Sequence, residues 1–156
     1  MSADETDLPV TNAAFGYCRD GAGRLLMVAN DYPGRGVWWG LPGGGLEPGE
    51  DHAACVVREF AEEVGLAVRV GRALGEIHRL RPDWGLNLRA RFYEVTGLDA
   101  APRVDPDEEH VIDFAWRTRD EIAAFAGVIL GRRYVLDYLD RPETYPKDIV
   151  MPPEEE

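Results

Sequence analysis

The chain has 156 residues, enough for one domain with a sizeable hydrophobic core and too few for two such domains. Hydrophobic residues form 45% of it and charged residues 29%, which excludes disorder of the whole chain. A formal net charge of −12 disfavours nucleic-acid polymers and anionic membranes as partners, although a small phosphate compound can bind where a divalent metal screens the carboxylates.

The sequence contains neither a leading apolar stretch of the secretory type nor an apolar run near the ~20 residues that cross a bilayer. Its cysteines, Cys18 and Cys55, have no spacing typical of a metal site, and buried free thiols are the simpler interpretation. We therefore expect a cytoplasmic protein.

Several apolar segments, rich in β-branched, aliphatic and aromatic residues, are typical of strands. The predicted strands span residues 10–18, 24–30, 37–41, 66–80, 86–95 and 111–117. The turn Asp20-Gly21 with Gly23 predicts that the first two strands form a hairpin. The glycine- and proline-rich segments 31–36, 42–49 and 81–85 are expected to be loops, and so is the segment 96–110.

Helix signals are clearest between residues 51 and 64, where Asp51 can cap the first turn and Gly65 can end the last. Thr118 and Glu121 form a capping box for a helix over residues 119–125. A further helix is expected over residues 128–139.

This element order predicts an α/β or α+β sandwich with a mixed sheet packed between helices. The expected domain covers residues 10–140, preceded by a flexible N-terminus at 1–9 and followed by a proline-rich tail at 141–156.

Three glutamates of the first predicted helix share one face, because Glu59, Glu62 and Glu63 stand at positions i, i+3 and i+4. Such a triplet alone most often marks a solvated helix face. Carboxylates are also the hard oxygen ligands that Mg²⁺ and Mn²⁺ prefer. The glycines before the helix, which let a ligand approach the backbone, and Arg58 beside the glutamates favour the metal site.

The spacing is Gly44, five residues, Glu50, seven residues, Arg58-Glu59-Phe60, one residue, Glu62-Glu63, one residue, Gly65-Leu66. This pattern resembles the 23-residue box of the Nudix hydrolases at every fixed position, from Gly44 to Leu66. The order of the surrounding elements is also similar to that family over roughly residues 10–140.

The resemblance implies an α/β/α sandwich with a central mixed sheet, and hydrolysis of a nucleoside diphosphate linked to another group with Mg²⁺ or Mn²⁺. It implies that Glu59, Glu62, Glu63 and the backbone carbonyl of Gly43 are metal ligands. Arg58 and Glu50 would fix the catalytic helix and loop, which Gly44 and Gly65 shape. Family members often form dimers, so a homodimer stays open.

A general base must take the proton of the attacking water. Glu62 or Glu63 can serve, and family members often add a carboxylate from outside the box. We select Glu109 from the acidic loop that also holds Asp105, Asp107 and Glu108, with a merely solvated loop as the alternative.

The substrate is less constrained by the sequence. Trp84 could stack on a base, and Arg35, Arg79 and Arg81 could meet phosphates, although solvated arginines are commoner. Pro82, 16 residues past the box, is similar to the ADP-ribose type, whereas the Trp-containing run into Leu-Pro-Gly-Gly is similar to members that cleave nucleoside triphosphates, including oxidised ones. Both remain open.

Two hypotheses of other classes remain. One is a Nudix-like module that has lost catalysis and senses a nucleotide, and the other is a structural interaction domain with an incidental acidic helix. A sensor would be expected to lose box glutamates, whereas this chain keeps all of them.

Overall fold

The computed structural model describes residues 8–98, 101–105, 110–144 and 149–151. The predicted flexible N-terminus falls mostly outside these residues. Within them, no helix combines the length and the apolar character needed to span a membrane.

The described strands form two mixed sheets rather than one. The first has the order β4-β1-β6-β5-β9, with bounds Gly43–Gly45, Thr11–Cys18, Leu86–Gly97, Val68–Arg81 and Ile149–Met151. The second has the order β7-β2-β3-β8, with bounds Val111–Arg117, Leu25–Tyr32, Gly36–Gly40 and Val128–Ile129. The helices are α2 (His52–Val64), α3 (Arg119–Ala124) and α4 (Arg132–Asp140), with short 3₁₀ turns η1 (Pro82–Trp84) and η2 (Pro142–Thr144).

The predicted turn at residues 20–23 is present and an antiparallel bridge joins Arg19 and Leu25, but the opening hairpin extends no further, because β1 and β2 belong to different sheets. β1 instead pairs in parallel with β6, from Thr11 opposite Leu88 to Cys18 opposite Val95. β2 pairs with β3 and β7 and buries all of its first five residues, as expected for an inner strand covered on both faces.

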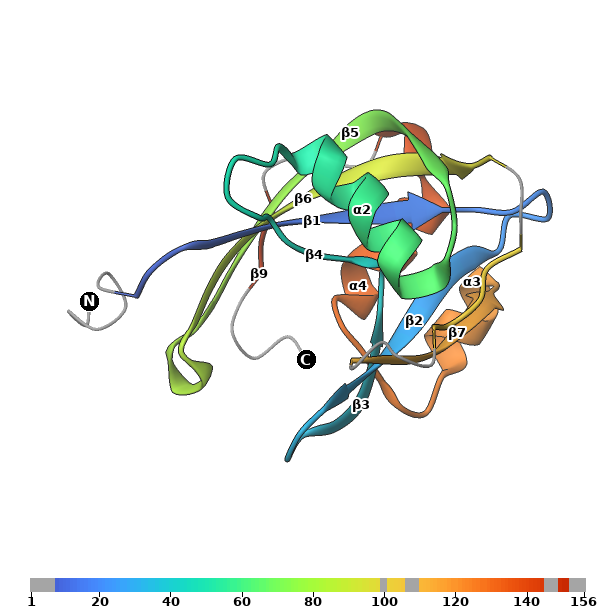
Figure 1. Ribbon diagram of the computed structural model, residues 1–156. Helices are drawn as coiled ribbons and strands as arrows, with labels where there is room; N and C mark the ends of the chain where they lie inside the picture. Colours follow the sequence, from blue (N-terminus) through green and yellow to red (C-terminus); the bar gives the residue numbers. More distant parts are fainter. Residues whose placement is uncertain (1–7, 99–100, 106–109, 145–148, 152–156) are drawn as a thin grey trace.

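Alternate residues of β2 enter two different core clusters. Leu25 and Met27 pack in one cluster with Tyr138 of α4, whereas Leu26 and Val28 pack in the other with Phe60 of α2. Because side chains alternate along a strand, the two clusters lie on opposite faces of β2. Figure 1 shows the strands between α2 and α4, and the predicted α/β/α sandwich is confirmed.

Two further predictions need correction. The helix expected over residues 128–139 begins only at Arg132, because Val128 and Ile129 pair with Trp38 and Trp39 of β3 and Gly131 adopts a left-handed φ of 63°. The glycine segment expected to be loop contains β4, which pairs with β1. Within the expected tail, η2 and β9 are described, and β9 extends the sheet alongside β5.

Phe60 anchors α2 on the sheet. Its side chain is fully buried, and it lies so close to Gly16 of β1 that a Cβ there would stand 2.6 Å from the ring. The absent side chain of Gly16 thus creates the space that lets α2 approach the sheet.

We predict that Phe60→Ala lowers the free energy of unfolding by about 3–5 kcal/mol, through lost burial and the cavity left behind. The control Val57→Ala changes an exposed position of the same helix and should alter stability by no more than about 0.5 kcal/mol. Urea unfolding of both variants measures the difference, and equal stabilities would contradict this account of how α2 is anchored.

Candidate functional site

Helix α2 begins and ends where the sequence predicts. The Asp51 carboxylate accepts a hydrogen bond from the Ala54 amide at 2.8 Å, which satisfies a free N–H of the first turn. Gly65 adopts a left-handed φ of 62°, and the amides of Gly65 and Leu66 donate to carbonyls of the last turn. A Cβ on Gly65 would stand 3.0 Å from the Arg103 side chain, so this position also needs a small residue.

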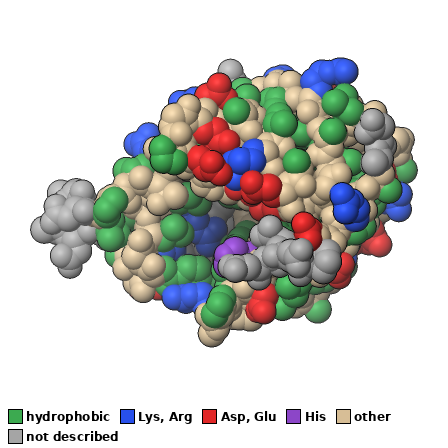
Figure 2. Space-filling view, in the orientation of Figure 1, with side chains coloured by type: hydrophobic (Ala, Val, Ile, Leu, Met, Phe, Trp, Pro, Cys, Tyr) green, Lys and Arg blue, Asp and Glu red, His purple; other side chains and the backbone are tan. Residues whose placement is uncertain are grey.

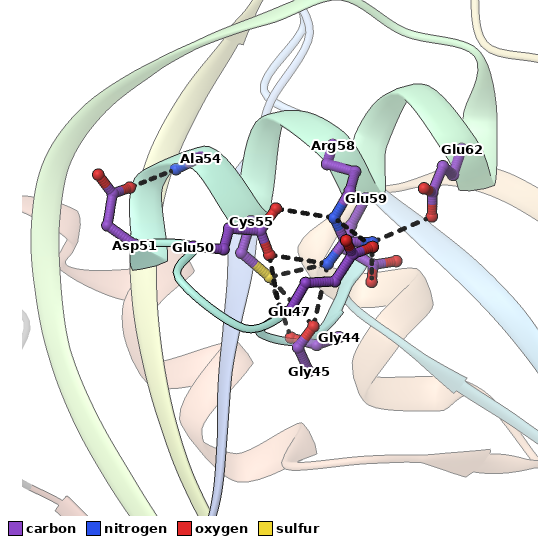
Figure 3. Close-up of polar contacts among 10 residues, drawn as sticks. All are labelled: Gly44, Gly45, Glu47, Glu50, Asp51, Ala54, Cys55, Arg58, Glu59 and Glu62. Carbon is purple, nitrogen blue, oxygen red and sulfur yellow. Dashed lines mark hydrogen bonds and ion pairs between the residues drawn. The ribbon is translucent and has the colours of Figure 1, made fainter.

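Arg58 ties α2 to the preceding loop (Figure 3). Its guanidinium donates to both carboxylate oxygens of Glu50, at 2.8 and 2.9 Å, and to the carbonyl of Gly45 at 3.0 Å. The carboxylate of Glu47 adds an ion pair at 3.3 Å. Bidentate arginine–carboxylate pairs fix geometry strongly, so this contact holds the loop against the helix.

The same guanidinium also binds two of the helix glutamates. Its Nη1 atom donates to Glu59 at 3.1 Å and to Glu62 at 3.1 Å. Glu59 and Glu62 therefore meet at one cationic nitrogen, as Figure 3 shows. A positive charge between these two carboxylates reduces the repulsion between them.

The segment Gly43–Gly45, here called the glycine loop, lies directly against Glu59 and Glu63. Glu63 is buried and accepts a hydrogen bond from the Gly43 amide at 3.1 Å. A Cβ on Gly44 would stand 2.7 Å from Glu59 Oε1, and one on Gly43 would clash with the backbone of β1. Gly43 is therefore required by the backbone of β1, whereas Gly44 leaves the space that the Glu59 carboxylate occupies.

The three glutamates differ in exposure. Glu63 is 8% exposed, the side chain of Glu59 is 13% exposed, and that of Glu62 is 51% exposed. Glu59 and Glu63 are therefore held between helix and loop, while Glu62 reaches solvent.

Arg58 has a clear electrostatic effect on its neighbours. Its hydrogen bonds hold the pKa of Glu50 near about 2, and Glu50 in turn raises the pKa of Arg58. Beneath this pair, Cys55 donates to the Gly44 carbonyl at 3.3 Å. Burial, with Glu50 and Glu59 nearby, raises the pKa of that thiol to about 11, so it stays protonated. The sequence analysis did not select Cys55, because a lone cysteine without metal-ligand spacing carries no signal of such a role.

Among the described residues, no three acidic, histidine or cysteine side chains already enclose a metal position. Glu59 and Glu62 instead face Arg58, and Glu63 faces Gly43. The donor set nevertheless suits a hard cation, since it consists of carboxylates beside a glycine backbone. The predicted extra carboxylate Glu109 lies outside the described residues, as do Asp107 and Glu108.

The predicted substrate residues meet at the tips of two hairpins. Arg35, between β2 and β3, and Arg81, at the end of β5, both place their guanidinium groups over the ring of Trp84 in η1. Tyr32, which the sequence analysis did not select, packs edge-on against Trp38 with ring centroids 5.7 Å apart. Figure 2 shows a hollow on this face, with acidic and basic side chains at its upper rim and basic side chains within it.

Comparison with known proteins agrees with this geometry. Residues 9–139 match the family model of the NUDIX domain. The chain therefore belongs to the Nudix hydrolase family, and the predicted resemblance is confirmed.

Relatives within the family carry different names. The NAD-capped RNA hydrolase NudC of Mycobacterium tuberculosis is 35% identical over 112 residues, which cover 67% of this chain and 32% of NudC. Human diphosphoinositol polyphosphate phosphohydrolase 3-alpha is 45% identical over 51 residues, 33% of this chain and 29% of that protein. The chain thus matches about a third of the length of each of these relatives.

Solved structures share the fold at lower identity. A MutT protein from Methanosarcina mazei superposes with a TM-score of 0.74 at 20% identity, covering 87% of this chain and 96% of that one. An ADP-ribose pyrophosphatase from Streptococcus suis gives a TM-score of 0.63 at 17% identity, covering 90% and 97%.

The Glu50–Arg58 pair predicts a pH dependence of stability. Because the folded-state pKa of Glu50 is about 2, below the ordinary 4.5, the stabilisation is complete above pH 4.5 and is lost as the pH falls towards 2. Glu50→Gln should therefore be less stable than the native chain above pH 4.5, with the difference shrinking below it. Urea unfolding across this range and a carboxyl NMR titration measure both effects. A Glu50 pKa of 4.5 would contradict the pairing.

Proposed function

We propose that the chain hydrolyses a phosphoanhydride bond in a nucleoside diphosphate linked to another group, releasing a nucleoside monophosphate and the phosphorylated remainder. The carrying observation is that Glu59 and Glu63 lie against the Gly43–Gly45 segment, while Glu62 meets Glu59 at the Arg58 guanidinium. These carboxylates, with the carbonyl of Gly43, would hold Mg²⁺ or Mn²⁺. Bound there, the metal supplies charge neutralisation for the diphosphate and a bound water of lowered pKa.

The loop and Arg58 keep the site in shape. Arg58 bonds Glu50 and the Gly45 carbonyl with one part of its guanidinium, and this contact does not involve the proposed ligands. The Nη1 atom stands where Glu59 and Glu62 meet, so a second cation there would compete with it for the same carboxylates. Arg58 is thus a positioning residue in this proposal.

The different exposures support different roles. Glu59 and Glu63 are held against the glycine loop, which suits ligands of fixed position. Glu62 is the exposed carboxylate and has the freedom to accept a proton from an attacking water. Glu109 remains the second candidate for that proton.

Substrates of two kinds fit the proposal. The Trp-containing run into Leu-Pro-Gly-Gly supports nucleoside triphosphates, including oxidised ones, whereas Pro82 supports ADP-ribose or nucleotide sugars, as does the name of the ADP-ribose pyrophosphatase that shares the fold. A catalytically silent nucleotide sensor is the rival. Retention of every box glutamate, together with the position of Glu59 and Glu63 against the Gly43–Gly45 segment, favours the enzyme. We place the protein in the cytoplasm, where the buried free thiols Cys18 and Cys55 would stay reduced.

Turnover on a nucleotide panel with Mg²⁺ or Mn²⁺ tests the proposal. We expect phosphate-bearing products from at least one compound, and a loss of turnover of at least about a hundredfold in Glu62→Gln and Glu63→Gln, because each removes a carboxylate from the site. The matched control Glu143→Gln changes an exposed glutamate of η2 and should keep full activity. Full activity of both site variants would refute the assignment, and tight binding without turnover would support the sensor.

The glycine loop offers a second test. Gly44→Ala would force the Glu59 carboxylate aside, because the new Cβ stands 2.7 Å from its oxygen, while the flexible side chain can move without disturbing the fold. We expect Mn²⁺ affinity to fall by roughly 10–100-fold with little change in melting temperature. The neighbouring Gly45→Ala is the control, since its Cβ meets nothing closer than 3.9 Å. Equal affinities in both variants would argue against Glu59 as a ligand.

A further inference from the structure

Trp84 lies against two guanidinium groups that come from separate hairpins. The Arg35 guanidinium carbon is 3.9 Å from the ring centroid and that of Arg81 is 4.3 Å away. The ring of Trp38 packs against Trp84 as well, with centroids 4.9 Å apart. A nucleotide base could therefore stack on Trp84 only by displacing a group already in contact with it.

Both arginines are held in place. The Trp38 indole donates to the Arg35 carbonyl at 2.9 Å, which fixes the loop that carries Arg35. Arg81 donates to the two carboxylate oxygens of Asp83, at 3.2 and 3.0 Å. Because an arginine stacks through its face, the N–H groups at the edge of Arg35 can still bind an anion.

A third arginine concentrates positive charge here. Arg79 is buried and stands two residues before Arg81 on the same strand, β5. Burial, and the neighbouring charge of Arg81, lower the pKa of Arg79 to about 10, so it remains charged at neutral pH. Three guanidinium groups thus lie in one region of a chain whose net charge is −12, with Arg79 near Arg81 and both Arg35 and Arg81 over Trp84.

This cationic group is connected to Tyr32 through Trp38, whose ring packs against the rings of both Trp84 and Tyr32. Burial and the charge of Glu63 raise the pKa of Tyr32, while the charge of Arg79 opposes that shift. Figure 2 shows acidic and basic side chains around one hollow, so a single ligand can contact both kinds of charge.

We propose that Arg35, Arg79, Arg81 and Trp84 form an anion site for a phosphate group of the substrate beyond the diphosphate that is cleaved at α2. In this site Trp84 is a positioning residue that holds the two guanidinium groups, rather than a stacking surface for a base. The proposal rests on the proposed function and narrows it to substrates that carry additional phosphate. Arginine edges match phosphate oxygens in bidentate geometry, which supports this choice of ligand.

Calorimetric titration with inositol hexakisphosphate in low-salt buffer containing EDTA tests the site, because this probe has phosphate groups but neither an anhydride nor a base. We expect binding that weakens at least about tenfold in Arg35→Ala, Arg81→Ala and Trp84→Ala, and that falls steeply with added salt. The control Arg89→Ala removes an exposed arginine paired with Glu76 on the sheet and should bind as the native chain does. Unchanged melting temperatures verify folding of each variant.

The outcomes separate this proposal from the proposed function. Glu62→Gln should lose turnover but keep hexakisphosphate binding, so a failure of the metal site leaves this measurement intact. Absence of binding by the native chain would overturn the anion site. Equal binding by Arg89→Ala and by the variants at Arg35, Arg81 and Trp84 would overturn it as well. If Trp84→Ala weakens binding of adenosine and leaves hexakisphosphate binding unchanged, Trp84 is a base platform and the proposal is wrong.

Discussion

The contact between Arg58 and the carboxylates around it is the constraint on which the rest of the site depends. A cluster of glutamates on one helix would repel in a chain that is already acidic. The guanidinium bonds Glu50, Glu59, Glu62 and the Gly45 carbonyl at once, so it offsets that repulsion and fixes the loop against α2. The carboxylates are thereby held close together, where they can bind a cation.

The surrounding fold supplies the space for this arrangement. Gly16 lets Phe60 press α2 onto β1, and Gly44 leaves room for the Glu59 carboxylate. Two hairpin tips bring arginines together around Trp84. Figure 2 shows charges of opposite sign around one hollow, an arrangement suited to a ligand that carries phosphates and also needs a metal.

Local signals were sufficient to predict α2 and the capping-box helix from the sequence. The caps at Asp51, Gly65 and Thr118 depend on residues within one turn of the helix end, and all three appear in the structure. The spacing of the box likewise placed Arg58 beside its glutamates. These features need no knowledge of distant strands.

Features that depend on distant partners could not be predicted in this way. β1 takes Leu88 and its neighbours as partners rather than the adjacent β2, and Val128 becomes a strand only because Trp38 lies beside it. The same holds for Trp84, whose contacts with Arg35 and Trp38 join two loops that are far apart in the chain. No periodicity or turn signal in either segment predicts these contacts of Trp84.

Anomalous diffraction from crystals soaked in Mn²⁺ tests the central claim most directly, because it locates the metal independently of turnover. The account predicts an anomalous peak coordinated by carboxylates of α2 beside the Gly43 carbonyl, with Arg58 still bonded to Glu50. A peak elsewhere on the protein, with Glu59 and Glu62 still bonded to Arg58, would contradict it.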